Sequence, residues 1–141
     1  MINRDTLSLI VRKRPQMETG NLLDCYVNLR SEMDTYMKYL KAWNKTVCMW
    51  GASHQGFTLA STSELGKHLA YIIDSAPFKQ GRFAPASHVP IVPPDHYFEE
   101  PVDAVLIVAP GYTDEIAGII KTRFGGKVEI MTLRTNRIEH L

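Results

Sequence analysis

The fold of this chain is decided by the stretch Thr46-Val-Cys-Met-Trp-Gly-Ala-Ser-His-Gln-Gly-Phe-Thr58. Its first five residues are mainly apolar or β-branched, as in a short buried strand, and a glycine-rich turn follows from Gly51 to Gly56. Nucleotide-binding α/β domains begin with this order of strand, glycine turn and helix. The stretch therefore predicts the first strand–helix unit of a parallel sheet.

Predicted strands and helices alternate on both sides of this stretch. Upstream, apolar residues recur every three or four positions from Leu22 to Trp43, which indicates a long helix with a packing face. Downstream, we expect helices at Gln55–Glu64 and Asp114–Phe124 and strands at Leu69–Asp74, Asp103–Ala109 and Lys127–Leu133. Such alternation is typical of an α/β, Rossmann-like, doubly wound and mostly parallel sheet with helices on both faces.

Smaller features complete the expected order of elements. His88–Val92 reads as a short extended piece at a sheet edge or in a loop, because prolines surround it. We expect Asp95 to cap a short helical turn and Thr113 to cap the helix that follows it. The pair Gly125-Gly126 is expected to end that helix.

The length of 141 residues indicates one domain, or one domain with an appendage. We expect residues 1–21 to hold an N-terminal strand, Thr6–Arg14, and a linker, and residues 22–141 to form the Rossmann-like domain. The N-terminal strand would leave an unpaired edge, so a homodimer is possible.

Bulk composition excludes several classes of protein. A net charge of +1 argues against a nucleic-acid partner, and no apolar run approaches the length of a membrane span. The two cysteines give no disulfide framework, which fits a cytoplasmic location, and the five histidines lack metal-ligand spacing. We therefore expect a cytoplasmic protein without a metal site.

The glycine turn carries the first candidate binding residues. Gly51, Ser53 and Gly56 occupy the three positions of a G-x-G-x-x-G turn, with serine where close approach of a pyrophosphate requires glycine. This favours a single phosphate or a differently placed sugar diphosphate at the helix N-terminus, and the alternative is a turn with no ligand. Phe57 replaces the lysine of a P-loop, which argues against an ATPase.

Asp74 and the long loop after it carry the other candidates. Asp74 follows Gly51 at roughly the 20-residue spacing of a ribose-binding acid, and the alternative is a cap for the next turn. In the loop, Lys79 and Arg82 are candidate phosphate ligands, and the alternative is solvated surface charge.

Two of these segments resemble a known family. Trp50-Gly-Ala-Ser-His-Gln-Gly56 and Ile73-Asp-Ser-Ala-Pro-Phe-Lys-Gln-Gly-Arg-Phe-Ala-Pro-Ala-Ser-His-Val-Pro-Ile-Val92 resemble the C-terminal domain of S-adenosylmethionine (SAM)-dependent sugar C-methyltransferases. The resemblance implies a Rossmann-like domain that helps to hold a nucleotide-linked sugar, for example a dTDP-linked one. It implies the following candidate substrate contacts: Gly51, Ala52, Ser53, His54, Gly56, Asp74, Lys79, Gln80 and His88.

By the same resemblance, methyl transfer belongs to a separate methyltransferase domain or subunit. We therefore expect no catalytic residue and no bound cofactor in this chain, with SAM held by a full-length relative or a partner. The chain departs from the family pattern at His54-Gln55 and at Ala86, where glycine is common. Two other functions stay open: a nucleotide- or NAD-binding regulatory module, and a structural interaction domain that docks through the Tyr/Met stripe of Leu22–Trp43.

Overall fold

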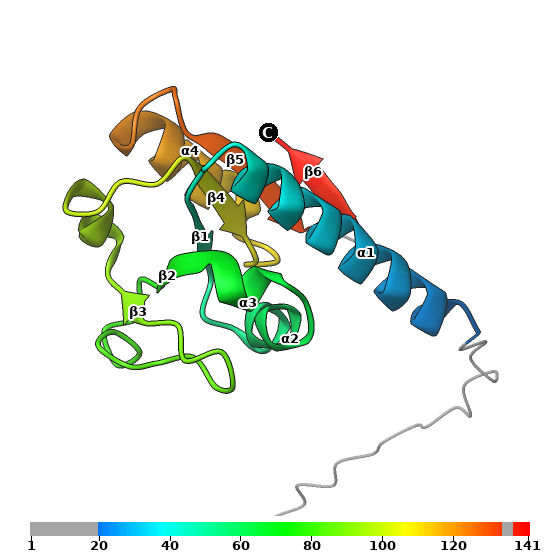
Figure 1. Ribbon diagram of the computed structural model, residues 1–141. Coiled ribbons are helices and arrows are strands. Elements are labelled where there is room, and N and C mark those ends of the chain that lie inside the picture. The colour runs from blue at the N-terminus through cyan, green and yellow to red at the C-terminus, as the bar shows by residue number, and fades with distance from the viewer. Residues whose placement is uncertain (1–19, 134–136) are drawn as a thin grey trace, which may run out of the picture.

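The computed structural model describes residues 20–133 and 137–141 (Figure 1). The expected strand at Thr6–Arg14 lies outside these residues. The described residues form six strands, four α-helices and one 3₁₀ helix, in the order α1 (Gly20–Ala42), β1 (Val47–Trp50), α2 (His54–Thr62), α3 (Leu65–His68), β2 (Leu69–Ile73), β3 (Ile91–Val92), η1 (Pro94–Phe98), β4 (Ala104–Ile107), α4 (Thr113–Arg123), β5 (Glu129–Leu133) and β6 (Ile138–His140). The alternation expected from the sequence is confirmed, and α1 begins at Gly20 rather than at Leu22.

The strands form one sheet in the order β3-β2-β1-β4-β5-β6. Neighbouring strands from β3 to β5 pair in parallel, and β6 pairs antiparallel to β5. The chain adds strands on one side of β1 and then crosses to the other side at β4, which is the strand order of a Rossmann-like sheet. The carboxyl ends of β1 and β4 therefore flank the topological switch point, where ligands of such sheets bind.

Helices cover both faces of the sheet, as expected. On one face, Met33, Met37 and Leu40 of α1 join α2 and α3 over alternate residues of the strands. On the other face, Ile116 and Ile120 of α4 pack with η1 over the intervening strand residues. Burial of a large apolar side chain contributes about 1.5–3 kcal/mol, so these two layers hold the sheet between them.

Two of the expected helix caps are wrong. Pro93 precedes η1, and Asp95 lies within its first turn, where its Oδ1 accepts a hydrogen bond from Arg123 Nη2 at 2.6 Å. Thr113 is the first residue of α4 rather than its cap, and it is buried with its Oγ1 3.5 Å from Thr132 Oγ1. The expected stop is confirmed, because Gly125 follows α4 with a φ of +84° that glycine adopts without strain.

The last strand, β6, is absent from the sequence-based expectation. It pairs with β5 and also meets α1, where the Ile138 N–H donates to Glu32 Oε2 at 3.3 Å. Figure 1 shows α1 running beside β6, with its N-terminal half extending past the sheet. The first described helix and the last strand thus close the same side of the domain.

Candidate ligand site at the carboxyl edge of the sheet

The Gly51 turn is shaped by close packing. Gly51 has a φ of +122°, and a Cβ atom there would lie 2.4 Å from the Val108 carbonyl oxygen. A Cβ atom at Gly56 would lie 2.8 Å from the Gly51 carbonyl oxygen. Both glycines are therefore required to press the turn and α2 onto the ends of β1 and β4, whether or not a ligand binds.

Several amides of this turn bond to groups inside the protein. Ala52 N–H donates to Asp74 Oδ2 at 2.9 Å, and Gly56 N–H donates to Ser53 Oγ at 3.3 Å. Ser53 Oγ also donates to the Val108 carbonyl at 3.3 Å, so this side chain both caps α2 and ties the turn to β4. The middle position of the motif thus carries a structural serine where a dinucleotide site needs open backbone.

Asp74, whose side chain is 12% exposed, stands at the centre of a partly buried polar cluster that we call the Asp74 tie, made of Ala52, Asp74, Ala76 and Lys79. Its Oδ2 accepts from Ala52 N–H and Lys79 Nζ, and its Oδ1 accepts from Ala76 N–H, each at 2.9 Å. Lys79 Nζ also donates to the Ala52 carbonyl at 2.8 Å. The geometry shows the capping role left open above, because Asp74 caps the following turn and fastens it to the Gly51 turn.

A first cleft lies at the switch point and has a volume of about 580 Å³. We call it the switch-point cleft. It is formed by the ends of β1, β2 and β4 and by α4, and it is lined by Trp50, Gly51, Ser53, Asp74, Ser75, Ala76, Lys79, Val108, Ala109, Pro110, Tyr112, Glu115, Ile116 and Ile119. Most of these walls are apolar, and their charged groups are the paired Asp74 and Lys79 together with Glu115.

A second cleft of about 530 Å³, the loop cleft, lies between the start of α2 and the loop at residues 75–90. It is lined by Ala52, Ser53, His54, Phe57, Phe78, Lys79, Arg82, Phe83, Pro85 and Ile91. Ser53 and Lys79 line both clefts, so the two are adjacent across the Asp74 tie.

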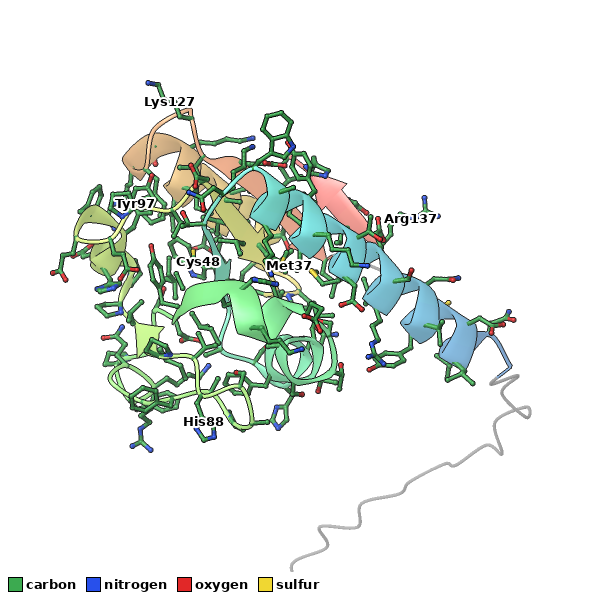
Figure 2. All side chains as sticks on the ribbon, viewed as in Figure 1. Met37, Cys48, His88, Tyr97, Lys127 and Arg137 are labelled. Carbon is green, nitrogen blue, oxygen red and sulfur yellow. The ribbon has the colours of Figure 1, made fainter. Side chains whose placement is uncertain are left out.

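The structure brings most of the sequence-predicted residues to these clefts. Gly56 lies buried beneath the turn, and Gln80 donates from Nε2 to the Asp74 carbonyl at 3.0 Å, which makes it part of the scaffold. His88 lines neither cleft and lies exposed at the outer rim of the loop (Figure 2).

Sequence reasoning missed several lining residues, namely Phe78, Phe83, Tyr112 and Glu115. The sequence did contain a signal for the two phenylalanines, because each is adjacent to a candidate phosphate ligand, Lys79 or Arg82, in the segment that resembles the family. Tyr112 and Glu115 had no such signal, because only the sheet topology places α4 beside the Gly51 turn.

The described part of the chain holds neither a candidate metal cluster nor a helix able to span a membrane. Within residues 20–133 and 137–141, no group of three or more His, Cys, Asp or Glu side chains is placed to hold a metal ion. No helix in the same ranges is both long and apolar enough to cross a membrane.

Residues 24–131 match the family model of the C-methyltransferase C-terminal domain. The chain belongs to this family. The match covers both segments on which the resemblance rested, and it confirms that resemblance. A search of curated proteins gave no match.

Two solved structures are similar to this member of the family. UDP-D-quinovosamine 4-dehydrogenase from Vibrio fischeri is 19% identical with a TM-score of 0.53, over 69% of this chain and 93% of that chain. RSP, a Rex-family repressor, is 15% identical with a TM-score of 0.49, over 74% of this chain and 60% of that chain. At such identities the likeness to the dehydrogenase concerns the fold, and it agrees with the Rossmann-like topology.

Proposed function

We propose that this domain binds and positions the nucleotide-linked sugar substrate of a SAM-dependent C-methyltransferase, while another domain or subunit transfers the methyl group. The observation that carries the proposal is the pair of adjacent clefts at the carboxyl edge of the sheet, in a chain of this family. Each cleft has the volume of a small-molecule site, and together they offer room for a two-part ligand.

One further observation supports a nucleotide-linked sugar as the substrate class. The V. fischeri protein of similar fold is a dehydrogenase of UDP-D-quinovosamine, which is a sugar nucleotide. A Rossmann-like edge with two clefts is therefore compatible with ligands of this class.

The residues at the switch point do not fit an adenosine cofactor. A ribose-binding acid must offer its carboxylate to hydroxyl groups, but Asp74 already accepts from Ala52 N–H, Ala76 N–H and Lys79 Nζ. Ser53 also places a side chain where a pyrophosphate would approach the turn. We therefore propose that SAM is held by the methyltransferase domain or a partner subunit, and we disfavour the NAD-binding alternative.

A thermal-shift screen tests the proposal. The folded chain is heated with dTDP-sugars, UDP-sugars, NAD or SAM at increasing concentration. A ligand at a hundred times its dissociation constant stabilises the native state by about 2.7 kcal/mol, which raises the melting temperature by several degrees. Stabilisation by nucleotide sugars alone supports the proposal. Stabilisation by NAD or SAM alone, or by none of the four, contradicts it.

A second function, protein interaction, is favoured by the N-terminal half of α1. Leu22, Leu23 and Val27 are 63%, 68% and 53% exposed there. Adjacent exposed apolar side chains are typical of interfaces. Of the Tyr/Met stripe expected from the sequence, Met33 and Met37 are buried on the sheet, whereas Tyr26 and Tyr39 are 37% and 44% exposed.

We propose that this half of α1 meets a second protein surface, either the methyltransferase domain or a second copy of the chain. Sedimentation velocity over a range of concentrations tests the homodimer. We expect association that is lost in Leu23→Asp/Val27→Asp and kept in Trp43→Ser, which alters an exposed apolar residue at the other end of α1. A monomer at every concentration would exclude the second copy as the occupant.

A further inference from the structure

Two phenylalanine side chains of the loop cleft are exposed on an ordered loop. Phe78 is 71% exposed and Phe83 is 65% exposed. The loop that carries them is held by backbone hydrogen bonds, including Gly81 N–H to the Ile91 carbonyl at 2.9 Å and Ile91 N–H to the Arg82 carbonyl at 2.8 Å. The rings are thus presented to solvent by a fixed backbone, at a cost in apolar hydration that a stacking partner would remove.

Groups that can bind an anion gather at the same cleft. Arg82 and His54 are exposed there, and Lys79 reaches the border with its charge shared with Asp74. Among the described residues, no carboxylate side chain lines this cleft, whereas Asp74 and Glu115 both line the switch-point cleft. A ligand phosphate is therefore favoured in the loop cleft and disfavoured next to Glu115.

We propose that the loop cleft is the nucleoside diphosphate subsite, in which Phe78 and Phe83 stack on the base and Arg82 and His54 contact the diphosphate. The inference rests on the proposed function, and it assigns the two parts of the ligand, the nucleoside diphosphate and the sugar, to separate clefts. Aromatic rings beside a cation are the combination that recognises a planar base joined to an anion.

The attached sugar then points toward the switch-point cleft. Ser53 and Lys79 line both clefts, so a ligand that passes over them leads from one to the other. Ile116, Ile119 and Tyr112 give the switch-point cleft apolar walls, which suit a sugar ring with few hydroxyl groups. This division leaves the sugar beside α4, and the base remote from it.

Isothermal titration calorimetry with dTDP, UDP and pyrophosphate as probes tests the assignment. Phe78→Ala and Phe83→Ala each should weaken dTDP binding roughly 5- to 20-fold and leave pyrophosphate binding unchanged, because one stacked ring is lost. Arg82→Gln should weaken both probes and reduce the dependence of binding on salt. Phe98→Ala is the matched control, since Phe98 is 54% exposed but lies on η1 outside both clefts.

The outcomes separate this inference from the proposed function. If Tyr112→Ala weakens dTDP binding or Glu115→Gln strengthens it, while the Phe78, Phe83 and Arg82 variants bind normally, the diphosphate lies in the switch-point cleft. That result overturns the assignment and leaves the proposed function standing. If the folded protein binds neither dTDP nor UDP nor any nucleotide sugar, both are overturned. All substituted side chains are exposed, so circular dichroism should show native folding in each variant.

Discussion

Removal of the Asp74 carboxylate should destabilise the domain strongly. In Asp74→Ala, Ala52 N–H and Ala76 N–H lose their acceptor, and Lys79 loses its ion-pair partner at 2.9 Å. Truncating one partner of a buried pair costs about 3–5 kcal/mol. The Lys79 side chain is 32% exposed and can turn to water, so we expect the lower end of that range, about 3 kcal/mol.

A double-mutant cycle isolates the ion pair from the amide hydrogen bonds. Lys79→Met removes the cation but leaves Asp74 bonded to both amides, so its cost should be smaller, about 1 kcal/mol. The coupling free energy between Asp74→Ala and Lys79→Met should be about 1–2 kcal/mol, because the two side chains share one contact. Urea unfolding followed by circular dichroism gives all four free energies.

The matched control is the pair Glu64–Lys67, which is also short at 2.7 Å but whose side chains are 42% and 70% exposed. Glu64→Gln should leave the unfolding midpoint within experimental error, because water screens this pair. If the free energy of unfolding of Asp74→Ala lies within about 0.5 kcal/mol of that of the unsubstituted chain, the Asp74 tie does not stabilise the fold. The carboxylate would then be kept for a ligand, contrary to the argument above.

Three further predictions follow from single positions. Ala86 has a φ of +62°, a conformation that costs an alanine about 1–2 kcal/mol. Glycine removes this strain but adds conformational entropy to the unfolded chain, so Ala86→Gly should raise the melting temperature by about 2–4 °C. A lower melting temperature would contradict this prediction. Gly51→Ala should lower the free energy of unfolding in urea by more than about 2 kcal/mol, because the new Cβ atom would clash with Val108. Gly118→Ala lies in open space on α4 and should raise that free energy by about 0.5–1 kcal/mol. Equal effects of the two substitutions would refute the packing argument. Burial raises the pKa of the Cys48 thiol and of the Tyr71 phenol. When the pKa of a group is higher in the folded than in the unfolded state, its full contribution to stability is present below the unfolded-state pKa and is lost as the pH rises above that pKa. The urea midpoint should therefore fall from about pH 8.5 upward, and it should fall less steeply in Cys48→Ala. A urea midpoint that does not change with pH would be inconsistent with these raised pKa values.

The sheet was predictable because its strands carry their own signal. Parallel strands are buried on both faces, so Val47–Trp50 and Ala104–Ile107 are continuous apolar runs. The strand β6 gave no such signal, since Ile138 is its one buried residue and pairing with Leu133 on β5 decides its conformation. The cap at Thr113 failed for a related reason, because tertiary packing against Thr132 outweighed the local preference of threonine for a cap.

The candidate site was predictable in place but not in detail. Gly51 and Asp74 correctly mark the carboxyl edge of the sheet, because a glycine turn and an acidic residue at the end of a strand are local sequence features. Their chemistry depends on partners distant in sequence: the carbonyl of Val108 explains Gly51, and the amide of Ala52 engages Asp74. The two clefts arise only when the loop at residues 75–90 and α4 are set on either side of that turn.

The contact between α1 and β6 has a consequence for how the chain acquires its structure during synthesis. A ribosome makes α1 first among the described elements and β6 last, yet Glu32 and Ile138 end up joined. Met33 and Met37 share a core cluster with Ile138, so part of their final cover is missing until residue 138 has emerged. Contacts between such remote segments slow folding and prolong the exposure of apolar surface. The domain can thus close only after its last described strand has been made, and until then the apolar face of α1 stays partly open to other binding partners.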